Sequence, residues 1–425
     1  MLSNRLRIII NFLILLTPTL INLLKHAGSI IVSLLVFFSI IVFFTTKQAT
    51  FSRREKLIMS SFAGYFLVCL IISVAHNFFD QESILQWEVD HELRMLAFVP
   101  IYYLFTKIKL KEWIFWHAIL FATILSGLYA LYVALGTHFS LRVIGPYNAC
   151  LYGYLSITLA FMSLSSYNYF YEKDKKLVIL PLFAFACGLL AAFLSGTRGS
   201  ILAVPFLLIL FLIQIYKYSQ TLNLKQVIVS LSAIFIVFIF LFPNSFMLKR
   251  FNKAFDDAKY CIDNYDCLDC FKKNQAARMR MWVESLIIIR DNYLFGVGPK
   301  GWQEKVTERV NKKEIAPGIE KFQSPHNMYL AMMSSYGILG FIMLLLIFLL
   351  PLFNFTHAIK RNKDNPAIIN IAYSGLSLIF SFMLCSLTGT LFNRNIIISF
   401  YLIMLAAALS IVRPHLDTNS SMAPK

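Results

Sequence analysis

The chain has 425 residues, of which 58% are hydrophobic and 14% are charged, and its mean hydropathy is +0.67. A soluble globular protein could not cover that much apolar surface with so few charges, so the composition excludes this class and indicates a polytopic membrane protein. The net charge of +17 falls largely in alternate loops between apolar stretches. This is the pattern of membrane topology, and it does not argue for nucleic-acid binding.

About 12 apolar stretches are candidates to cross the bilayer, because a spanning helix needs about 20 residues of this kind. In chain order they cover roughly 8–24, 29–44, 57–75, 93–105, 113–135, 149–164, 177–194, 200–216, 226–242, 327–353, 367–387 and 396–412. The fourth stretch is short and is interrupted by Pro100. The first follows Arg5 and Arg7 as a signal peptide would, but no small-residue cleavage site comes after it, so we expect a retained signal-anchor.

Lysine and arginine are distributed very unevenly between the loops. The short loops of the poorer side carry only Lys25, Arg142, Arg198 and Arg394, with Arg94 at the start of a span. The positive-inside rule therefore places both termini of this multi-pass protein in the cytoplasm. We expect an all-α polytopic integral membrane protein with one large, partly helical periplasmic loop. Its regions are spans one to nine in 1–242, the periplasmic loop in 243–325, spans ten to twelve in 326–412 and a cytoplasmic tail in 413–425.

The large loop contains segments suited to chemistry. A helix is predicted from Gln275 to Arg290, in which Arg278 and Trp282 are four residues apart and share a face. The glycine-rich stretch from Gly296 to Trp302 predicts a tight turn whose backbone could approach a ligand. This turn lacks the strand and the Gly-Lys-Ser/Thr ending of a nucleotide loop, so ATP binding is rejected.

The loop closes with the residues Ser-Pro-His-Asn at 324–327. Ser324 as N-cap and Pro325 at the first helical position predict a helix start, which puts His326 in the first turn of the tenth span. Unpaired N–H groups and the helix dipole there favour anions over an imidazolium, so we expect His326 to stay neutral and able to accept a proton. The alternative is that His326 only caps the helix or lies at the water interface.

Three arginines on the poorly charged side lie at the membrane edge in short turns. Arg198 lies within Ser195–Gly199, whose small residues leave its guanidinium accessible. A guanidinium suits phosphate oxygens because of its bidentate geometry and fixed charge. Arg142 and Arg394 are weaker candidates of the same kind. The alternative is that these arginines only anchor helix ends at the membrane surface.

Metal binding and ion coupling are not indicated. Cys261, Cys267 and Cys270 cluster in the large loop, where a disulfide or plain thiols are favoured over a zinc site because no histidine lies nearby. No Asp-x-Asp pair or His-rich cluster occurs, so we expect no metal and no other cofactor. No carboxylate lies in the middle of a span, which counts against a proton- or sodium-coupled transporter.

Several stretches resemble the O-antigen ligase and polymerase family of polytopic bacterial glycosyltransferases. Ser195–Gly199 is similar to the family's Ser-x-Ser/Thr-Arg-Gly turn. Arg278–Trp282 and Leu294–Gly298 are similar to its Arg-x-x-x-Trp helix and Gly-Val-Gly turn. Ser324–Leu330, which runs on to Tyr336–Gly340, is similar to its Pro-His-Asn-x-Tyr-Leu segment. Together these motifs are specific, and the likeness in topology spans the chain.

The resemblance implies transfer of a glycan from undecaprenyl pyrophosphate to an acceptor on the periplasmic side. Carried over by motif, Arg198 and Arg278 bind the pyrophosphate and His326 takes the proton of the acceptor hydroxyl. Arg280 competes with Arg278 for its role, and the spacing to Trp282 favours Arg278. Further substrate-binding candidates are Arg142, Arg280, Asn327, Tyr329 and Arg394. Direct, inverting transfer is expected, since no carboxylate pair is placed to act as a glycosidase-type nucleophile.

The family does not fix the acceptor. It is the lipid A-core oligosaccharide for the ligase, another lipid-linked repeat unit for the polymerase, and a Ser or Thr for the protein-glycosylating branch. The length of the chain and a loop of this size favour the ligase in lipopolysaccharide biosynthesis, with the polymerase as the alternative. A flippase of the same lipid-linked glycan is the alternative of a different class. It would more naturally show basic residues along a path within the spans and an inverted repeat.

Overall fold

In the computed structural model, residues 4–80, 90–218, 274–315 and 317–415 are described, together with the isolated residues Asp256 and Lys259. All regular elements in these ranges are helices. Ten are long and apolar enough to cross a membrane, which confirms the predicted all-α polytopic class. These ten spans contain α1 (Asn4–Leu23), α2 (Ala27–Thr45), α3 (Arg53–Asp80), α6 (Glu112–Gly136), α7 (Ala149–Leu164), α9 (Ile179–Leu194), α10 (Arg198–Tyr218), α15 (Met328–Arg361), α16 (Pro366–Cys385) and α17 (Asn395–Val412).

These ten helices coincide with ten of the predicted spans. The predicted span 226–242 and the cysteines Cys261, Cys267 and Cys270 lie outside the described residues, as does the tail beyond His415. The shorter elements are α4 (Asp90–Leu96), α5 (Phe98–Ile108), α8 (Tyr167–Lys173), η1 (Lys175–Val178), α13 (Asn274–Asp291), α14 (Gly301–Asn311), η3 (Leu391–Asn393) and η4 (Arg413–His415).

The fourth predicted span is divided into α4 and α5. Pro100 has no N–H to donate to the carbonyl four residues earlier, so the helical hydrogen bonding breaks just before it. The two pieces still connect opposite ends of the bundle. At one end Asp90 accepts a hydrogen bond from Asn395 at the start of α17 (2.5 Å), and at the other Tyr102 donates to Glu55 near the start of α3 (2.6 Å).

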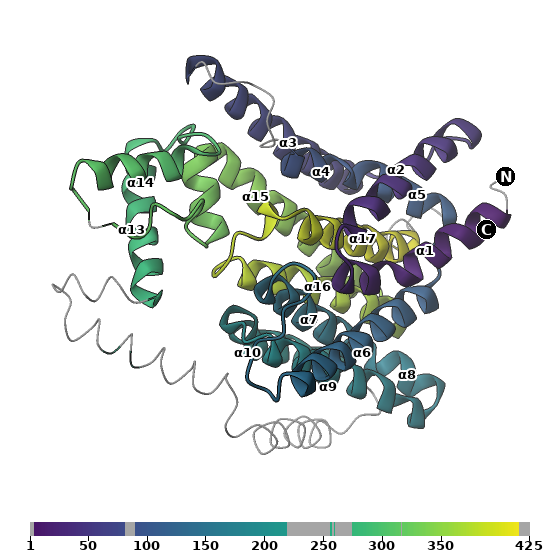
Figure 1. Cartoon of the computed structure of the whole chain (residues 1–425). Coiled ribbons are helices and arrows are strands. Elements are labelled where there is room, and N and C mark those ends of the chain that lie inside the picture. Colours follow the sequence, from purple (N-terminus) through teal and green to yellow (C-terminus); the bar gives the residue numbers. More distant parts are fainter. Residues whose placement is uncertain are drawn as a thin grey trace.

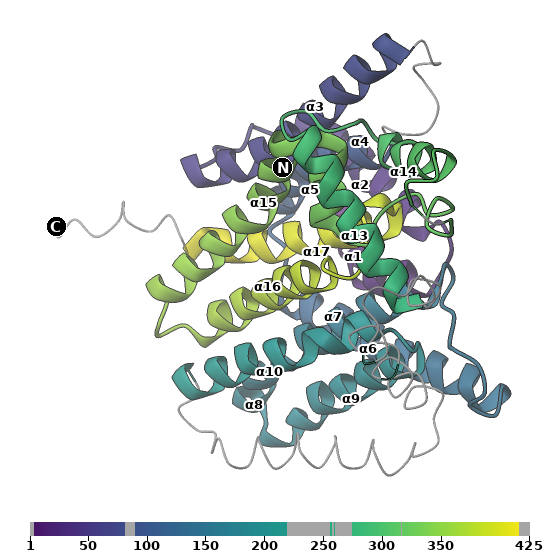
Figure 2. The same cartoon turned by 90° about the vertical axis from the view of Figure 1, so that its left-hand side faces the viewer.

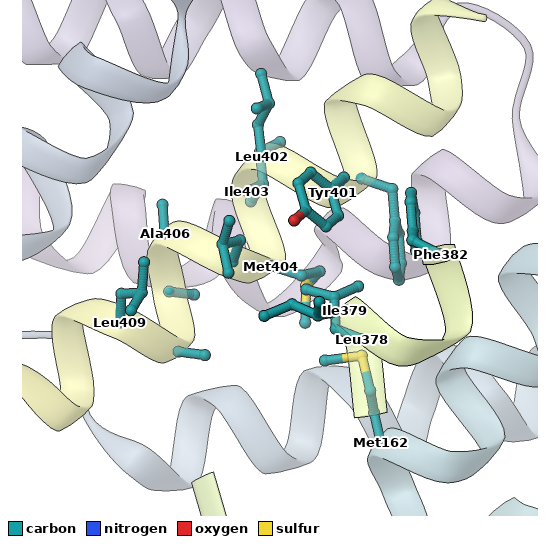
Figure 3. Packing of buried hydrophobic residues seen from close by; sticks show 14 of the residues in the cluster. Met162, Leu378, Ile379, Phe382, Tyr401, Leu402, Ile403, Met404, Ala406 and Leu409 are labelled. Carbon is teal, nitrogen blue, oxygen red and sulfur yellow. The ribbon is translucent and has the colours of Figure 1, made fainter. Parts of the chain in front are cut away.

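Helices α7, α16 and α17 form the centre of the bundle, and each is buried along most of its length. Figure 3 shows Phe382 of α16 beside Tyr401 of α17, with Met162 of α7 reaching the same cluster; the Phe382 and Tyr401 ring centroids are 4.8 Å apart. Lipid provides no hydrophobic driving force between helices, so their close approach depends on shape and on small side chains. The buried run Ala406–Ala408 of α17 meets this need.

The helix ends gather on two faces. On one, the basic face, the end of α17 meets the start of α3 through an ion pair between Arg413 and Glu55 (2.6 Å), and Lys107 of α5 donates to the carbonyl of Lys47 after α2. On the opposite one, the site face, α13 and α14 lie beside the start of α15. Figure 1 shows α13 and α14 at the left, away from N and C, and Figure 2 shows α13 running across this face.

The predicted glycine-rich turn packs against α15, and its backbone does not line the cavity described below. Helix α15 is kinked at Gly337 (φ 61°, ψ −161°), which leaves carbonyls of the preceding turn without helical partners. The turn supplies them, because Val297 N–H donates to Ser334 and Gly298 N–H donates to Ser335, both at 2.9 Å. In this structure the glycines allow close approach to another helix, and the approach of this backbone to a ligand stays a prediction.

Helices α13 and α14 form a small unit with its own core. The predicted helix over 275–290 is confirmed as α13, whereas α14 was not predicted. The cluster contains Met281 and Ile288 of α13, and Trp302 and Val306 of α14. The Trp302 indole donates to the Ser285 hydroxyl (2.8 Å). This unit carries Arg278 to the site face.

Candidate functional site

A cavity of about 220 Å³ opens on the site face. Its walls come from α7, the turn between α9 and α10, α13 and the segment before α15, so it joins parts of the chain that are far apart in sequence. We call it the arginine cavity. It is lined by Arg142, Cys150, Tyr154, Gly196, Thr197, Arg198, Gly199, Ala277, Arg278, Met281, Phe322 and His326.

The turn that carries Arg198 is fixed by buried hydrogen bonds. Helix α9 ends at Leu194 and α10 begins at Arg198 itself, so the connection is shorter than predicted. The Ser195 hydroxyl donates to Thr197, and the Thr197 hydroxyl donates to the carbonyl of Ala149 at the start of α7, both at 2.9 Å. Gly196 has φ 64°, a conformation that side chains disfavour. The turn therefore holds Arg198 at the cavity wall, in the first turn of a long helix.

Arg142 lines the same cavity but binds protein carbonyls. Its Nε donates to Ser195 O (2.8 Å) and its Nη2 to Gly196 O (3.5 Å). These carbonyls follow the last residue of α9, where a helix end leaves acceptors unsatisfied and favours a positive charge. This geometry gives Arg142 a supporting role for the turn that carries Arg198.

Helix α13 presents Arg278 to the cavity and is hydrogen-bonded to the segment that carries His326. The Trp282 indole N–H, one turn after Arg278, donates to the carbonyl of Pro325 (3.0 Å). Met281, 1% exposed, anchors the helix between them. Arg280 is not among the lining residues; it is buried near Glu284 and Glu320, and burial lowers its pKa while both carboxylates oppose that shift.

His326 lies just before α15, and the predicted helix start is wrong by a few residues. Asn327 is the N-cap, since its side chain accepts from the N–H groups of Tyr329 and Leu330 (3.0 and 3.2 Å). The Ser324 hydroxyl instead pairs with that of Thr390 (3.1 Å). An asparagine directly before the first helical residue satisfies two orphan donors, which Ser324 could do only from a longer helix.

The first N–H groups of α15 are consequently occupied by protein. Met328 N–H donates to the carbonyl of Ser386 after α16 (2.8 Å), and Asn327 accepts from the next two. The expectation of unpaired N–H groups that bind an anion here is therefore wrong. Positive charge in the cavity therefore comes from cationic side chains and not from the start of α15.

His326 is held in a left-handed conformation (φ 52°). Its ring packs edge-on against Phe322, with centroids 5.4 Å apart. Burial lowers the pKa of His326 below its ordinary value of 6.5, and the positive charges of Arg278 and Arg394 lower it further. The imidazole is therefore neutral near pH 7. This agrees with the expected protonation state, with burial as the largest cause.

Of the residues that the sequence singled out, the structure brings Arg142, Arg198, Arg278 and His326 into one cavity. The others lie outside its lining. Asn327 is buried as a helix cap, and the Tyr329 hydroxyl donates to the carbonyl of Met383 (2.9 Å). Arg394 is exposed at the start of α17, yet close enough to act on His326.

Sequence reasoning missed most of the neutral lining. Phe322 precedes His326 by four residues, and this spacing is a weak signal for a ring contact. Tyr154 carries no such signal, because it lies within an apolar span. Its hydroxyl lies 3.2 Å from the Thr388 hydroxyl, so it links the cavity wall to the segment after α16.

An apolar groove of about 430 Å³ lies between α10 and α16. Tyr329, three residues after His326, also lines it, as does Leu387, next to Thr388. Phe206 in the groove is eight residues after Arg198, which is about 12 Å along a helix. The groove therefore lies near residues of the arginine cavity and follows α10.

The described lining of the arginine cavity contains no acidic group: none of its residues in the ranges that the structure describes is Asp or Glu. In the described part of the chain, no group of three or more His, Cys, Asp or Glu residues could hold a metal ion. The chemistry that this wall supports is binding of an anion by guanidinium groups next to a neutral imidazole.

Comparison with known proteins places these residues in one family segment. The model of a family described as O-antigen ligase matches residues 183–345, which contain Arg198, Arg278 and His326. An uncharacterized protein of Haemophilus influenzae is 30% identical over 317 residues, which cover 73% of this chain and 75% of that protein.

Proposed function

Since the chain belongs to the O-antigen ligase family, we propose that it transfers polymerised O-antigen glycan from undecaprenyl pyrophosphate to lipid A-core oligosaccharide. Membership of this family supports the assignment of the chain as a membrane glycosyltransferase that uses lipid-linked glycans. The observation that carries the proposal is the convergence of Arg198, Arg278 and a neutral His326 in one cavity whose described lining contains no acidic residue. The positive-inside pattern supports a site face in the periplasm and both termini in the cytoplasm, for a protein of the Gram-negative inner membrane.

The donor pyrophosphate binds to Arg198 and Arg278. They come from different elements, the start of α10 and α13, so they can hold two phosphoryl groups from two sides. Planar guanidinium groups pair with phosphate oxygens through two parallel hydrogen bonds. They neutralise the charge that develops on the leaving group as transfer proceeds. Arg142 contributes by fixing the turn that carries Arg198.

His326 acts as the general base. Its neutral imidazole takes the proton from the acceptor hydroxyl as that oxygen attacks the anomeric carbon of the donor glycan. The bond from this carbon to the pyrophosphate oxygen breaks, and its electron pair leaves with undecaprenyl pyrophosphate. A single displacement inverts the anomeric carbon, and it needs neither a nucleotide sugar nor a metal ion.

The apolar groove accepts the polyprenyl chain of the donor. It lies between α10, which carries Arg198, and α16, and Tyr329 joins it to the histidine segment. A bound donor then keeps its chain against apolar side chains and its pyrophosphate in the arginine cavity.

Purified protein with lipid-linked glycan and lipid A-core acceptor tests the proposal. We expect His326→Ala to abolish transfer while the protein still inserts and purifies as a folded species. His138→Ala, which changes a histidine outside the cavity lining, is the matched control and keeps the wild-type rate. Normal transfer by His326→Ala would rule out the base assignment, and no transfer by the wild-type protein, with movement of the lipid across vesicles, would favour the flippase.

A deletion strain separates the ligase from the polymerase. Loss of a ligase leaves long glycan on the lipid carrier and none on lipid A-core. Loss of a polymerase leaves lipid A-core with a single repeat unit. We expect the first lipopolysaccharide banding pattern, and the second would reassign the protein to the polymerase branch.

Metal removal is a further test of the mechanism. Transfer is expected to proceed at the same rate in EDTA, because guanidinium groups supply the charge that a divalent ion supplies elsewhere. Loss of transfer in EDTA that magnesium or manganese restores would contradict this.

A further inference from the structure

A second cavity, with basic side chains among its lining residues, lies on the basic face, at the end of the bundle opposite the candidate site. Its volume is about 320 Å³, and it is formed by the first turns of α3 and the last turns of α15. We call it the basic-face cavity. It is lined by Arg54, Leu57, Ile58, Leu350, Phe353, Asn354, Thr356, His357 and Lys360.

The charge of this cavity is positive, and none of the described residues that line it is a carboxylate. Within the described residues, the side chains of Arg54, His357 and Lys360 make no hydrogen bond or ion pair. The charged groups that act on His357 are Arg54, Arg361 and Lys360, all basic. The adjacent acid, Glu55, is buried on another side of α3, where Arg413 and Tyr102 bind it (both 2.6 Å). Such a concentration of cations favours an anionic ligand.

A polar atom lies deeper in the same wall. Asn354 is 5% exposed, and its amide oxygen has no hydrogen-bond partner among the residues that the structure describes. A buried acceptor without a donor costs free energy, which a ligand hydroxyl or ammonium group would recover. The cavity therefore offers an anion site at its rim and a hydrogen-bond acceptor below it.

Most of the remaining lining is apolar, and part of it is exposed on the outer surface of the bundle. Leu57 is 49% exposed and Phe353 is 60% exposed, and they lie on α3 and α15, both candidate membrane spans. A ligand with apolar chains can therefore lie along these helices while its polar group enters the cavity. Basic pockets between spanning helices commonly bind lipid headgroups.

We propose that the basic-face cavity binds an anionic glycerophospholipid whose headgroup carries a hydroxyl. The phosphate pairs with Arg54 and Lys360, the headgroup hydroxyl donates to Asn354, and the acyl chains lie over Leu57 and Phe353. This lipid joins α3 to α15, the helix that begins next to His326. The site is separate from the arginine cavity and does not depend on the proposed glycosyl transfer.

Lipid binding by the full-length protein in detergent, measured by native mass spectrometry, tests this site. The probe is phosphatidylglycerol, compared with phosphatidylcholine and with free glycerol 3-phosphate. We expect selective retention of phosphatidylglycerol. Binding should be about 30-fold weaker when Arg54→Gln and Lys360→Gln are combined, which is the factor expected for the loss of two cations near an anionic lipid. Asn354→Leu keeps every charge and is expected to weaken binding about threefold.

The matched control combines Lys109→Gln with Lys111→Gln. It removes two positive charges beside the end of α5, outside the cavity lining, and should leave binding unchanged. Equal loss in this control would overturn the proposal in favour of general surface attraction. Equal retention of phosphatidylcholine, or displacement of the lipid by an equimolar amount of glycerol 3-phosphate, would also overturn it. All comparisons are made on the monodisperse, folded fraction of each variant.

Discussion

The hydrogen bond from Trp282 to the carbonyl of Pro325 is expected to set the position of His326. It is 3.0 Å long and links α13, which carries Arg278, to the residue directly before the proposed base. Trp282→Phe removes the indole N–H while keeping an aromatic ring in the same place. We expect slower glycan transfer with little change in folding, because the base is no longer held at a fixed distance from Arg278.

The size of the effect follows from the burial of the acceptor. Pro325 is buried, so water cannot readily replace the lost donor, and an unsatisfied buried acceptor costs about 1–3 kcal/mol. If that cost appears in the barrier to transfer, the rate falls between about fivefold and about 150-fold, because about 1.4 kcal/mol corresponds to a factor of ten. We expect about tenfold, measured as kcat/KM with purified protein and lipid-linked donor.

Trp302→Phe provides the matched control within the same two-helix unit. It also removes one indole hydrogen bond, to Ser285 at 2.8 Å, from a tryptophan that is 1% exposed. It should lower the thermal unfolding temperature at least as much as Trp282→Phe, yet leave transfer close to wild type in the folded fraction. Equal loss of transfer in both variants, or an unchanged rate in Trp282→Phe, would refute a specific link between Trp282 and His326.

Three further predictions concern charge, pH and backbone shape. Arg198→Lys and Arg278→Lys keep the charge but lose the bidentate geometry, so each should reduce kcat/KM at least about tenfold; wild-type rates in both would make them simple membrane anchors. Because the pKa of His326 is lowered, its base form persists through pH 7 and the rate should fall only below pH 6.5. Arg394→Gln removes a positive neighbour and raises this pKa, so the fall of the rate on the acid side of the pH profile should move to higher pH. An unchanged pH profile would exclude His326 as the titrating base. Gly337→Ala would place a methyl group against the carbonyl of Leu294 at positive φ. This should lower the free energy of unfolding by at least about 2 kcal/mol and lower the unfolding temperature. An unchanged unfolding temperature would show that the kink is not required.

The amino-acid sequence determined the class of fold and most of the spans. In a bilayer every backbone polar group must be satisfied within the segment, so long apolar stretches become helices whatever surrounds them. The helix over 275–290 was likewise readable, because its apolar and basic residues recur with helical spacing. The division of the fourth span was indicated by Pro100, whose missing N–H acts locally.

The convergence of Arg198, Arg278 and His326 depends on how α10, α13 and α15 pack, and no local pattern contains it. The sequence pointed to these residues through a family resemblance, and the arginine cavity is where the structure places them.

Tertiary structure alone decided what each candidate contacts, because the partners come from distant elements. Arg142 binds carbonyls after α9, the glycine-rich turn fills the kink at Gly337, and Asn327 takes the cap that local preference gave to Ser324. A hydrogen-bonding group is satisfied by whichever partner the fold brings within about 3 Å, and spacing along the chain cannot reveal that partner.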